Sequence, residues 1–224
     1  MKKFALGVAL MLPAVTIAAA ANADDRISSA AEVLQDVMSS PDKGIPQDLF
    51  NKAQCVIVIP SMIKGAFVVG AEYGKGFAVC RRSDGVGWGA PAAVVMEGGS
   101  FGFQIGGSST DVVALVMSQH GMQKLMGDKF TLGADASVAA GPVGRTAGAG
   151  TDIALRSDIL AWSRARGLFA GVSLNGASLR PDEHADEELY GHKINNHEVL
   201  GGGVAPPAAA QPLRSELDKF SMMK

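Results

Sequence analysis

The chain has 224 residues, of which 47% are hydrophobic and 19% are charged, and it contains 28 glycines but only two tryptophans and two tyrosines. This length is enough for one domain with a sizeable core, and its richness in valine, alanine and glycine is more typical of a sheet protein than of a helical bundle. The formal net charge of −2 excludes the strongly basic footprint expected of a nucleic-acid-binding protein.

Charge is distributed unevenly along the chain. Residues 24–50 carry 2 basic and 6 acidic side chains, residues 51–180 carry 12 and 8, and residues 181–224 carry 4 and 8. A segment of net charge +4 therefore lies between two segments of net charge −4. A few phosphate contacts are compatible with this excess, provided that the basic side chains converge.

The amino terminus has the pattern of a secretory signal. Lys2 and Lys3 precede an apolar run over residues 4–21, and Ala21-Asn22-Ala23 offers small residues at both positions that a signal peptidase reads. The alternative is a membrane anchor, but Pro13 and Asn22 make the run marginal for a bilayer core of roughly 30 Å.

We therefore expect cleavage after Ala23 and a periplasmic or secreted protein. No cysteine precedes Cys55, so the thiol that bacterial lipid anchoring requires is absent and the protein is not expected to be a lipoprotein.

The residues that follow the predicted signal peptide have the periodicity of a helix. Asp24 and Asp25 are predicted to cap a helix whose apolar residues recur every three and four positions, namely Ile27, Ala30, Ala31, Leu34, Val37 and Met38. Pro46 is expected at the first position of a second, short helix.

From residue 55 onward the pattern is that of strands. Residues 55–59 are apolar on both faces, which predicts a covered central strand. Residues 64–73 alternate as a second strand, Gly74-Lys75-Gly76 is predicted to turn the chain into residues 77–81, and Asp84-Gly85 marks a further hairpin.

Further strands are expected at residues 92–96, 101–105, 112–117 and 132–140, with a helix around residues 119–126. Residues 158–174 resemble a hairpin that turns at Arg166-Gly167. Leu213, Leu217 and Phe220 can form one face of a last helix, which is expected to pack loosely.

These elements predict an α+β fold: one curved, mainly antiparallel sheet or partial barrel with flanking short helices. The expected organisation is a signal peptide over residues 1–23, a single domain over residues 24–200, and a Gly/Pro/Ala-rich tail with a short terminal helix over residues 201–224.

Cys55 and Cys80 are the only cysteines. In an oxidising compartment such a pair favours a disulfide, and closing a loop of about 25 residues is worth roughly 3–4 kcal/mol. The alternative is two buried free thiols.

No catalytic or metal-binding pattern has the context it needs. Gly98-Gly-Ser-Phe-Gly102 matches the hydrolase elbow around Ser100, but the residues that follow are glycine-rich and alternate like a strand, so the required helix is missing. The four histidines, at positions 120, 184, 192 and 197, have no metal-ligand spacing. We therefore expect a non-enzymatic protein without a cofactor or metal.

Several motifs in order resemble the SYLF-domain family, over about residues 28–200. They are Cys55-Val-Ile-Val-Ile-Pro60, Lys64-Gly-Ala-Phe-Val-Val-Gly70, Gly87-Trp88 with Pro91, Gly98-Gly-Ser-Phe-Gly-Phe-Gln-Ile-Gly106, Leu132-Gly-Ala-Asp-Ala-Ser137, Gly141-Pro-Val-Gly-Arg145, Gly167-Leu-Phe-Ala-Gly-Val-Ser-Leu174 and Tyr190-Gly191.

The resemblance implies lipid binding, since eukaryotic relatives bind phosphoinositides and fungal ones also bind and bundle actin. A periplasmic protein meets neither actin nor, normally, phosphoinositides, and the polar face of the first predicted helix is acidic. From the resemblance we therefore expect this chain to bind an anionic lipid or membrane surface, without specifying the headgroup.

The candidate lipid-binding residues are the basic ones on predicted strands and turns. Lys64, Lys75, Arg81 and Arg82 surround two predicted hairpins, and Arg145, Arg164 and Arg166 follow later, as does Arg156. If several meet on one rim, they can hold a phosphate; otherwise they are solvated surface charges. Arg145 follows Gly141-Pro-Val-Gly144, whose backbone N–H groups could also face an anion.

Three hypotheses follow for the function. The first is a peripheral domain that binds anionic lipid headgroups. The second is a lipid carrier with an internal acyl cavity, and the third is a structural or adhesion module that binds an envelope protein through strand edges.

Overall fold

The structure of the protein, a computed structural model, describes residues 22–40, 44–66, 69–101, 106–144, 156–165 and 167–221. The elements are α1 (Ala23–Met38), α2 (Gln47–Lys52), β1 (Cys55–Ala66), β2 (Val69–Arg81), β3 (Trp88–Phe101), β4 (Gly106–Val116), α3 (Gln119–Met126), β5 (Phe130–Thr131), β6 (Val138–Ala140), β7 (Ile159–Ala165), β8 (Leu168–Gly171), β9 (Ser178–Pro181), α5 (Glu183–Tyr190), α6 (Asn196–Leu200), the 3₁₀ turn η1 (Ala208–Ala210) and α7 (Gln211–Phe220).

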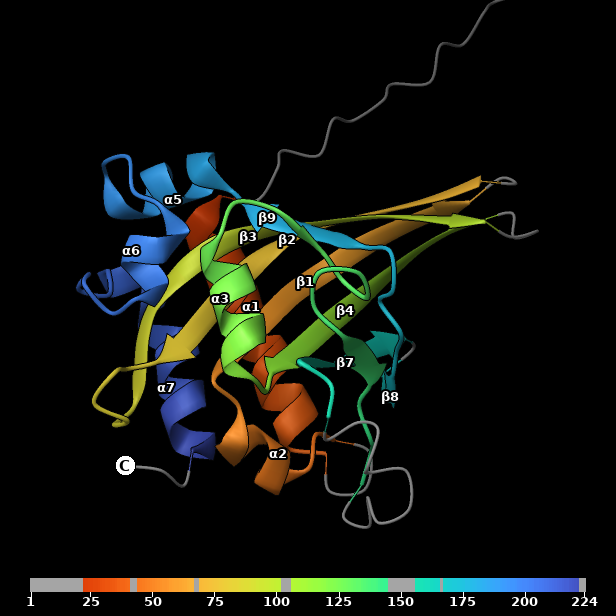
Figure 1. Ribbon diagram of the computed structural model, residues 1–224, viewed down its shortest axis with the longest axis horizontal. Helices are drawn as coiled ribbons and strands as arrows, with labels where there is room; N and C mark the ends of the chain where they lie inside the picture. The colour runs from red at the N-terminus through yellow and green to blue at the C-terminus, as the bar shows by residue number, and fades with distance from the viewer. Residues whose placement is uncertain are drawn as a thin grey trace, which may run out of the picture.

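The strands form one strongly curled, half-barrel sheet with helices on both faces (Figure 1). Their order is β5-β9-β3-β2-β1-β4-β7-β6, with β8 paired to β7. Of the strand pairings described, β6 with β7 is parallel and the others are antiparallel. The predicted curved, mainly antiparallel sheet with flanking short helices is therefore confirmed.

Two apolar cores arise because β1 is apolar on both faces, as predicted. Val56 and Val58 pack toward α1, α2, α5 and α7. Ile57 and Ile59 pack toward α3 and α6 on the other face. Figure 1 shows α1 behind the sheet and α3 in front of it. Alternate residues of a strand point to opposite faces, so a continuous apolar run is what a doubly covered central strand requires.

The N-cap of the first helix lies two residues before Asp24, the earlier of the two predicted capping residues. Asn22, and not Asp24 or Asp25, is the N-cap, and its side-chain oxygen accepts the N–H of Asp25 at 2.7 Å. The two aspartates lie in the first turn, where negative charge is favourable next to the positive end of the helix dipole.

The predicted single strand over residues 64–73 is wrong. Residues 64–66 end β1 and pair with residues 70–72 of β2, while residues 67–68 lie outside the described residues. Earlier in β1 there is a bulge, where the register shifts between Ile59 and Met62. Of the predicted strand over residues 101–105, Phe101 ends β3, and residues 102–105 lie outside the described residues.

Gly74-Lys75-Gly76 is not a turn but the middle of β2. A Cβ atom at Gly76 would lie 2.0 Å from the Val58 carbonyl oxygen, and one at Gly74 would lie 2.6 Å from the Ile59 side chain. These glycines therefore permit close packing of β2 against the bent part of β1 and do not reverse the chain.

Residues 132–140 are also not one strand. The chain turns at Gly133, whose φ is +86°, and resumes as β6 only at Val138. Asp135 accepts the Thr131 N–H at 2.7 Å and Asp158 accepts the Ser137 N–H at 2.9 Å, and these bonds hold the turn. Hydrogen bonds to two side-chain carboxylates thus hold a turn where the alternating sequence pattern predicts a strand.

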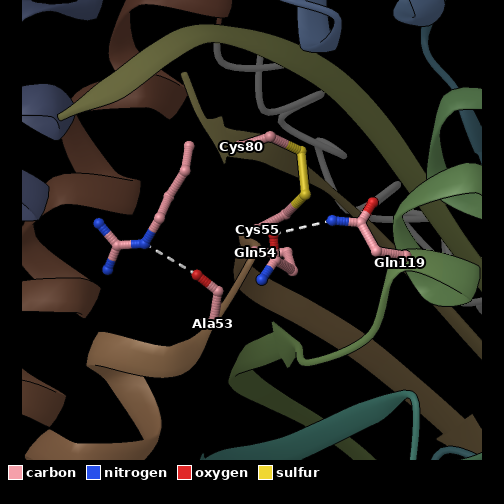
Figure 2. Close-up of a disulfide and its surroundings, with 6 residues drawn as sticks. Ala53, Gln54, Cys55, Cys80 and Gln119 are labelled. Atoms are coloured by element: carbon pink, nitrogen blue, oxygen red, sulfur yellow. Dashed lines mark hydrogen bonds between the residues drawn. A yellow bond between two sulfur atoms is a disulfide. The ribbon is translucent and has the colours of Figure 1, made fainter. Parts of the chain in front are cut away.

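The predicted disulfide between Cys55 and Cys80 is confirmed (Figure 2). The two cysteines lie directly opposite each other in β1 and β2, with Cα atoms 3.9 Å apart, and both are buried. The predicted hairpins at Asp84-Gly85 and within residues 158–174 are present as β2–β3 and β7–β8.

The carboxy-terminal part is better ordered than expected. The acidic segment after Pro181 forms α5 and α6, which were not predicted. Leu213 and Leu217 of α7 are fully buried in the core beside α1, so the expected loose packing of this helix is wrong. None of the helices within the described ranges is long and apolar enough to cross a bilayer.

Candidate functional site

The predicted lipid-binding residues are placed in several different parts of the molecule. Arg145 and Arg166 lie outside the described residues. The other five, Lys64, Lys75, Arg81, Arg82 and Arg164, are described, and each has at least one polar partner.

Arg81 holds the ends of three elements together. Its guanidinium donates to the carbonyl oxygens of Ala53 at 3.0 Å and Asn51 at 3.2 Å, and to the Ser221 hydroxyl at 3.0 Å. It also lies 4.3 Å from the centre of the Trp88 ring. Burial lowers the pKa of this guanidinium. Arg81 therefore links the end of α2 and the carboxy terminus of α7 to the sheet.

Arg164 links α1 to the sheet in the same way. It donates to Asp111 of β4 at 2.8 Å, pairs with Asp36 of α1, and lies 5.5 Å from the Phe169 ring centre. Burial lowers the pKa of Arg164, but the hydrogen bonds to both carboxylates outweigh it, so the pKa is raised. The guanidinium stays charged and bound to carboxylates from two elements.

Lys75 belongs to a third link. Its ammonium lies 2.8 Å from the Asp182 carboxylate, which also pairs with Arg26 of α1 at 3.5 Å. Asp182 is buried, and two nearby cations offset the cost of removing its charge from water.

Lys64 and Arg82 are the outlying members. Lys64 pairs with Glu72 on the neighbouring strand at 3.1 Å, and Arg82 pairs with Asp84 in the exposed β2–β3 turn at 2.9 Å. Nine residues of β2 separate Glu72 from Arg81, which is about 30 Å along a strand. The five described residues therefore do not form one cluster, and their role in lipid binding stays a prediction.

Sequence reasoning missed a feature that we call the arm. The arm consists of the ends of four strands beyond the bulge, residues 63–66, 69–73, 97–101 and 106–110. Figure 1 shows these strand ends projecting past the helices. A Cβ atom added at Gly65 would meet nothing within 4 Å, and one at Gly107 would meet only the Lys64 carbonyl oxygen at 3.9 Å, so neither position is covered.

Two large apolar side chains lie exposed on one face of the arm. Ile63 is 62% exposed and Tyr73 is 44% exposed, and the two are directly opposite each other in β1 and β2. Residues paired in this way have Cβ atoms about 5 Å apart. They therefore form one contiguous apolar contact.

The bulge sets the arm apart from the covered part of the sheet. Ser61 has a positive φ of 50°, and its N–H donates to Asp111 at 2.9 Å. Because the other oxygen of Asp111 accepts from Arg164 of β7, one carboxylate holds both the bulge of β1 and the neighbouring strand β7 at the base of the arm.

Two of the hollows on the body of the molecule suit an anion poorly. One of about 350 Å³ is lined by Asp128, Glu183 and Glu198 together with His197. A second, of about 420 Å³, has Arg180 and Lys129 in its wall. The Arg180 guanidinium already forms an ion pair with the Glu97 carboxylate, with nitrogen and oxygen 2.7 Å apart. Hydrogen bonding to this carboxylate raises the pKa of Arg180.

The face of the sheet beneath α1 is filled with side chains. Ile27, Leu34 and Val37 of α1 are fully buried against Val58 and Phe77 of the sheet. The hypothesis of an acyl-binding interior therefore gains no support from this core.

Asp186 is a buried carboxylate between α5 and the sheet. One of its oxygens accepts the Ala93 N–H at 2.7 Å, and the other has no partner. Burial raises the pKa of Asp186 to about 7; the Ala93 hydrogen bond opposes this and the charge of Asp182 adds to it.

Within the part of the chain that the structure describes, neither the hydrolase pattern around Ser100 nor a metal site gains support. Ser100 lies inside β3, opposite Gly70, so the strand continues where a hydrolase would turn into a helix. Within the described ranges no three His, Cys, Asp or Glu side chains gather as a metal-ligand group.

Comparison with known proteins identifies relatives along most of the chain. The chain is 36% identical over 186 residues to the human SH3 domain-containing YSC84-like protein 1, covering 82% of this chain and 53% of that protein. It is 37% identical over 172 residues to the fission-yeast SH3 domain-containing protein PJ696.02 (75% and 40%), and 33% identical over 175 residues to LAS seventeen-binding protein 3 of Saccharomyces cerevisiae (77% and 38%).

The chain thus spans about half the length, or less, of these curated relatives. The family model described as "Ysc84: Las17-binding protein actin regulator" matches residues 97–220, which is more than half of the chain. That description names binding and regulation and no reaction. The predicted resemblance is confirmed: the chain belongs to the Ysc84, or SYLF-domain, family.

Proposed function

We propose that this protein is a non-enzymatic module that binds anionic phospholipid membranes, and that the arm makes the contact. The observation that carries the proposal is the exposed Ile63–Tyr73 pair on a part of the sheet that none of the described helices covers. An exposed apolar contact on a projecting element is a feature of surfaces that bind membranes or proteins.

The pair combines two side chains suited to the membrane boundary. Tyr73 has an apolar ring and a polar hydroxyl, which suits the headgroup level of a bilayer, while Ile63 gains free energy by leaving water. Burying most of one such side chain is worth roughly 1–2 kcal/mol.

Lys64 supports the preference for anionic lipid. Its ion pair with Glu72 is only partly buried, and exposed pairs of this kind contribute about 0–1 kcal/mol. A lipid phosphate can therefore compete with Glu72 for the ammonium. Lys75, Arg81 and Arg164 are poorer candidates because they hold helices against the sheet.

Vesicle sedimentation tests the proposal. The protein is mixed with vesicles of phosphatidylcholine alone or with added phosphatidylglycerol, and the bound fraction is measured against lipid concentration. Ile63→Ser and Tyr73→Ser should each weaken binding by about five- to thirtyfold, whereas Val86→Ser should not, although Val86 is also about half exposed and lies at the other end of the β2–β3 pair.

The contribution of Lys64 is tested separately. Lys64→Ala should reduce binding to the phosphatidylglycerol vesicles by about fivefold, with Arg82→Ala in the exposed turn as the matched control. If neither arm variant changes vesicle binding, or if the wild-type protein does not bind phosphatidylglycerol vesicles, the proposal is wrong.

We also propose that the protein is exported and cleaved after Ala23. Cleavage there would remove the N-cap Asn22 and the first helical residue Ala23, and would leave the new amino group on Asp24, next to Asp25 in the first turn of α1. Mass spectrometry of the protein recovered from the periplasm should find Asp24 as the first residue; a chain that retains the lysines at positions 2 and 3 would contradict export by this route.

A further inference from the structure

The arm has an open side in addition to its exposed face. Residues 111–116 of β4 pair with β1 on one side and with β7 on the other. Residues 106–110 pair with β1 alone, and no other backbone partner is described for them. Among the described residues, the outward N–H and C=O groups of this five-residue segment therefore form a free strand edge, which ends at the buried Thr110.

This edge lacks the usual protection against strand pairing. Natural edge strands carry lysine, proline or a bulge, or are covered by another element. The sequence here is Gly106-Gly-Ser-Ser-Thr110, with no charge and no proline. It is also unbulged, since its register with β1 runs continuously from Ala66–Gly106 to Met62–Thr110.

The opposite edge of the arm is different. Residues 98–101 of β3 also lack an outer partner among the described strands, but a Cβ atom at Gly98 would lie 3.4 Å from Ala177. The chain leading into β9 thus partly shields this edge, and the charged residues Glu97 and Arg180 lie at its base.

We propose that the β4 edge of the arm pairs with the same edge of a second copy of this chain. In a two-fold antiparallel pairing each residue meets a residue of its own segment, so any charge would meet a like charge nearby. An uncharged five-residue edge meets this condition, and none of its own side chains is larger than threonine.

Pairing of the two β4 edges also fixes where the exposed Ile63–Tyr73 contacts of the two copies lie. The two-fold axis of such a pair is perpendicular to the sheet, because antiparallel strands within one sheet share the same faces. The Ile63–Tyr73 contacts of both copies therefore lie on the same face of an eight-stranded arm. This inference does not depend on lipid binding and is tested without lipid.

Sedimentation equilibrium of the purified protein, over a range of concentrations and without vesicles, tests the pairing with a matched pair of variants. Gly107 on the β4 edge and Gly99 on the β3 edge are equivalent sites, because a Cβ atom at either would have one backbone oxygen at 3.9 Å as its nearest neighbour. Gly107→Lys should weaken the dimer by about tenfold or more, and Gly99→Lys by less than about twofold.

Cysteine variants give an independent readout, since both native cysteines are joined in the disulfide. At least one of Gly107→Cys, Ser108→Cys and Ser109→Cys should form an intermolecular disulfide on mild oxidation, because paired Cα atoms lie about 4.5–5.5 Å apart; Gly99→Cys should not.

The proposal is overturned by a protein that stays monomeric up to its solubility limit, or by a dimer that Gly99→Lys dissolves and Gly107→Lys does not. Circular dichroism of each variant shows whether it is folded; if Gly107→Lys is not, Ser109→Lys on the same edge replaces it with the same expected outcome.

Discussion

The same four strands, β1 to β4, pass through two different environments. In the body, which is the part of the sheet with helices on both faces, they carry large apolar side chains that are almost fully buried. In the arm they carry mainly glycine, alanine and serine, and the large apolar residues Ile63 and Tyr73 face solvent. The difference indicates that the body supplies most of the stability, and we propose that the arm supplies the binding surface.

Core truncation should separate the two regions most clearly. Leu34 of α1 is fully buried in the body, and Leu34→Ala should lower the free energy of unfolding by about 2–5 kcal/mol. Ile63→Ala in the arm should lower it by less than about 0.5 kcal/mol. Urea unfolding measures both, and comparable losses would erase the distinction.

The disulfide should be the next largest contribution, and it belongs to the body. Replacing Cys55 and Cys80 by alanine should lower the free energy of unfolding by about 3 kcal/mol, because the unfolded chain loses a closed loop. The same chemical unfolding experiment applies, with dithiothreitol on the wild type as a second route. A midpoint that does not move in either case would count against this assignment.

Asp186 predicts a pH dependence of the body. Its pKa is about 7 in the folded protein against 3.8 for the ordinary group, so between these values the folded state binds more protons than the unfolded state. Stability is thus highest at low pH with respect to this group and falls as pH rises, by about 2–3 kcal/mol between pH 5 and pH 8.

Asp186→Asn should remove most of this slope in unfolding experiments at a series of pH values. Asp158 has the opposite effect on the pH dependence of stability, and at lower pH. Burial would raise its pKa, but hydrogen bonds from Ser118 and Ser137 outweigh burial and lower the pKa to about 2. Its contribution is therefore lost as pH falls from 3.8 toward 2. If the pH profile of Asp186→Asn matches the wild type between pH 5 and pH 8, the buried carboxylate has been misassigned.

The smallest effect distinguishes a structural arginine from a surface one. Arg164→Gln breaks contacts with Asp36 and Asp111 and should cost about 1–2 kcal/mol, whereas Arg82→Gln in the exposed turn should cost less than about 0.5 kcal/mol. Thermal unfolding is sensitive enough for this pair. Equal melting temperatures for the two variants would mean that Arg164 does not fasten α1.

Much of the fold could be predicted because it follows from local patterns. The apolar run at residues 55–59 indicated a central strand, and the three- and four-residue spacing indicated α1. The errors arise from contacts that residue patterns do not reveal: Gly74 and Gly76 have turn composition but pack against Val58 and Ile59, and the strand predicted over residues 132–140 is interrupted by a turn that hydrogen bonds to Asp135 and Asp158 hold.

The candidate site could be predicted only in part. Basic residues could be named from the sequence, but not their partners, because Asp36, Asp111 and Asp182 are distant in the chain from Arg164 and Lys75. The arm left a signal that is readable in retrospect. Strands built from small residues on both faces, such as residues 106–110, cannot bury enough apolar surface to attract a covering helix.

An environment-sensitive fluorophore tests most directly whether the arm is the surface that meets the membrane. It is attached at Ala71→Cys, which lies on the exposed face beside Tyr73, and in a second protein at Ser83→Cys, in the exposed turn at the far end of β2. With phosphatidylglycerol vesicles, the emission at position 71 should shift to the blue while that at position 83 stays unchanged. A shift at position 83 alone, or none at either site while the protein sediments with the vesicles, would contradict the account.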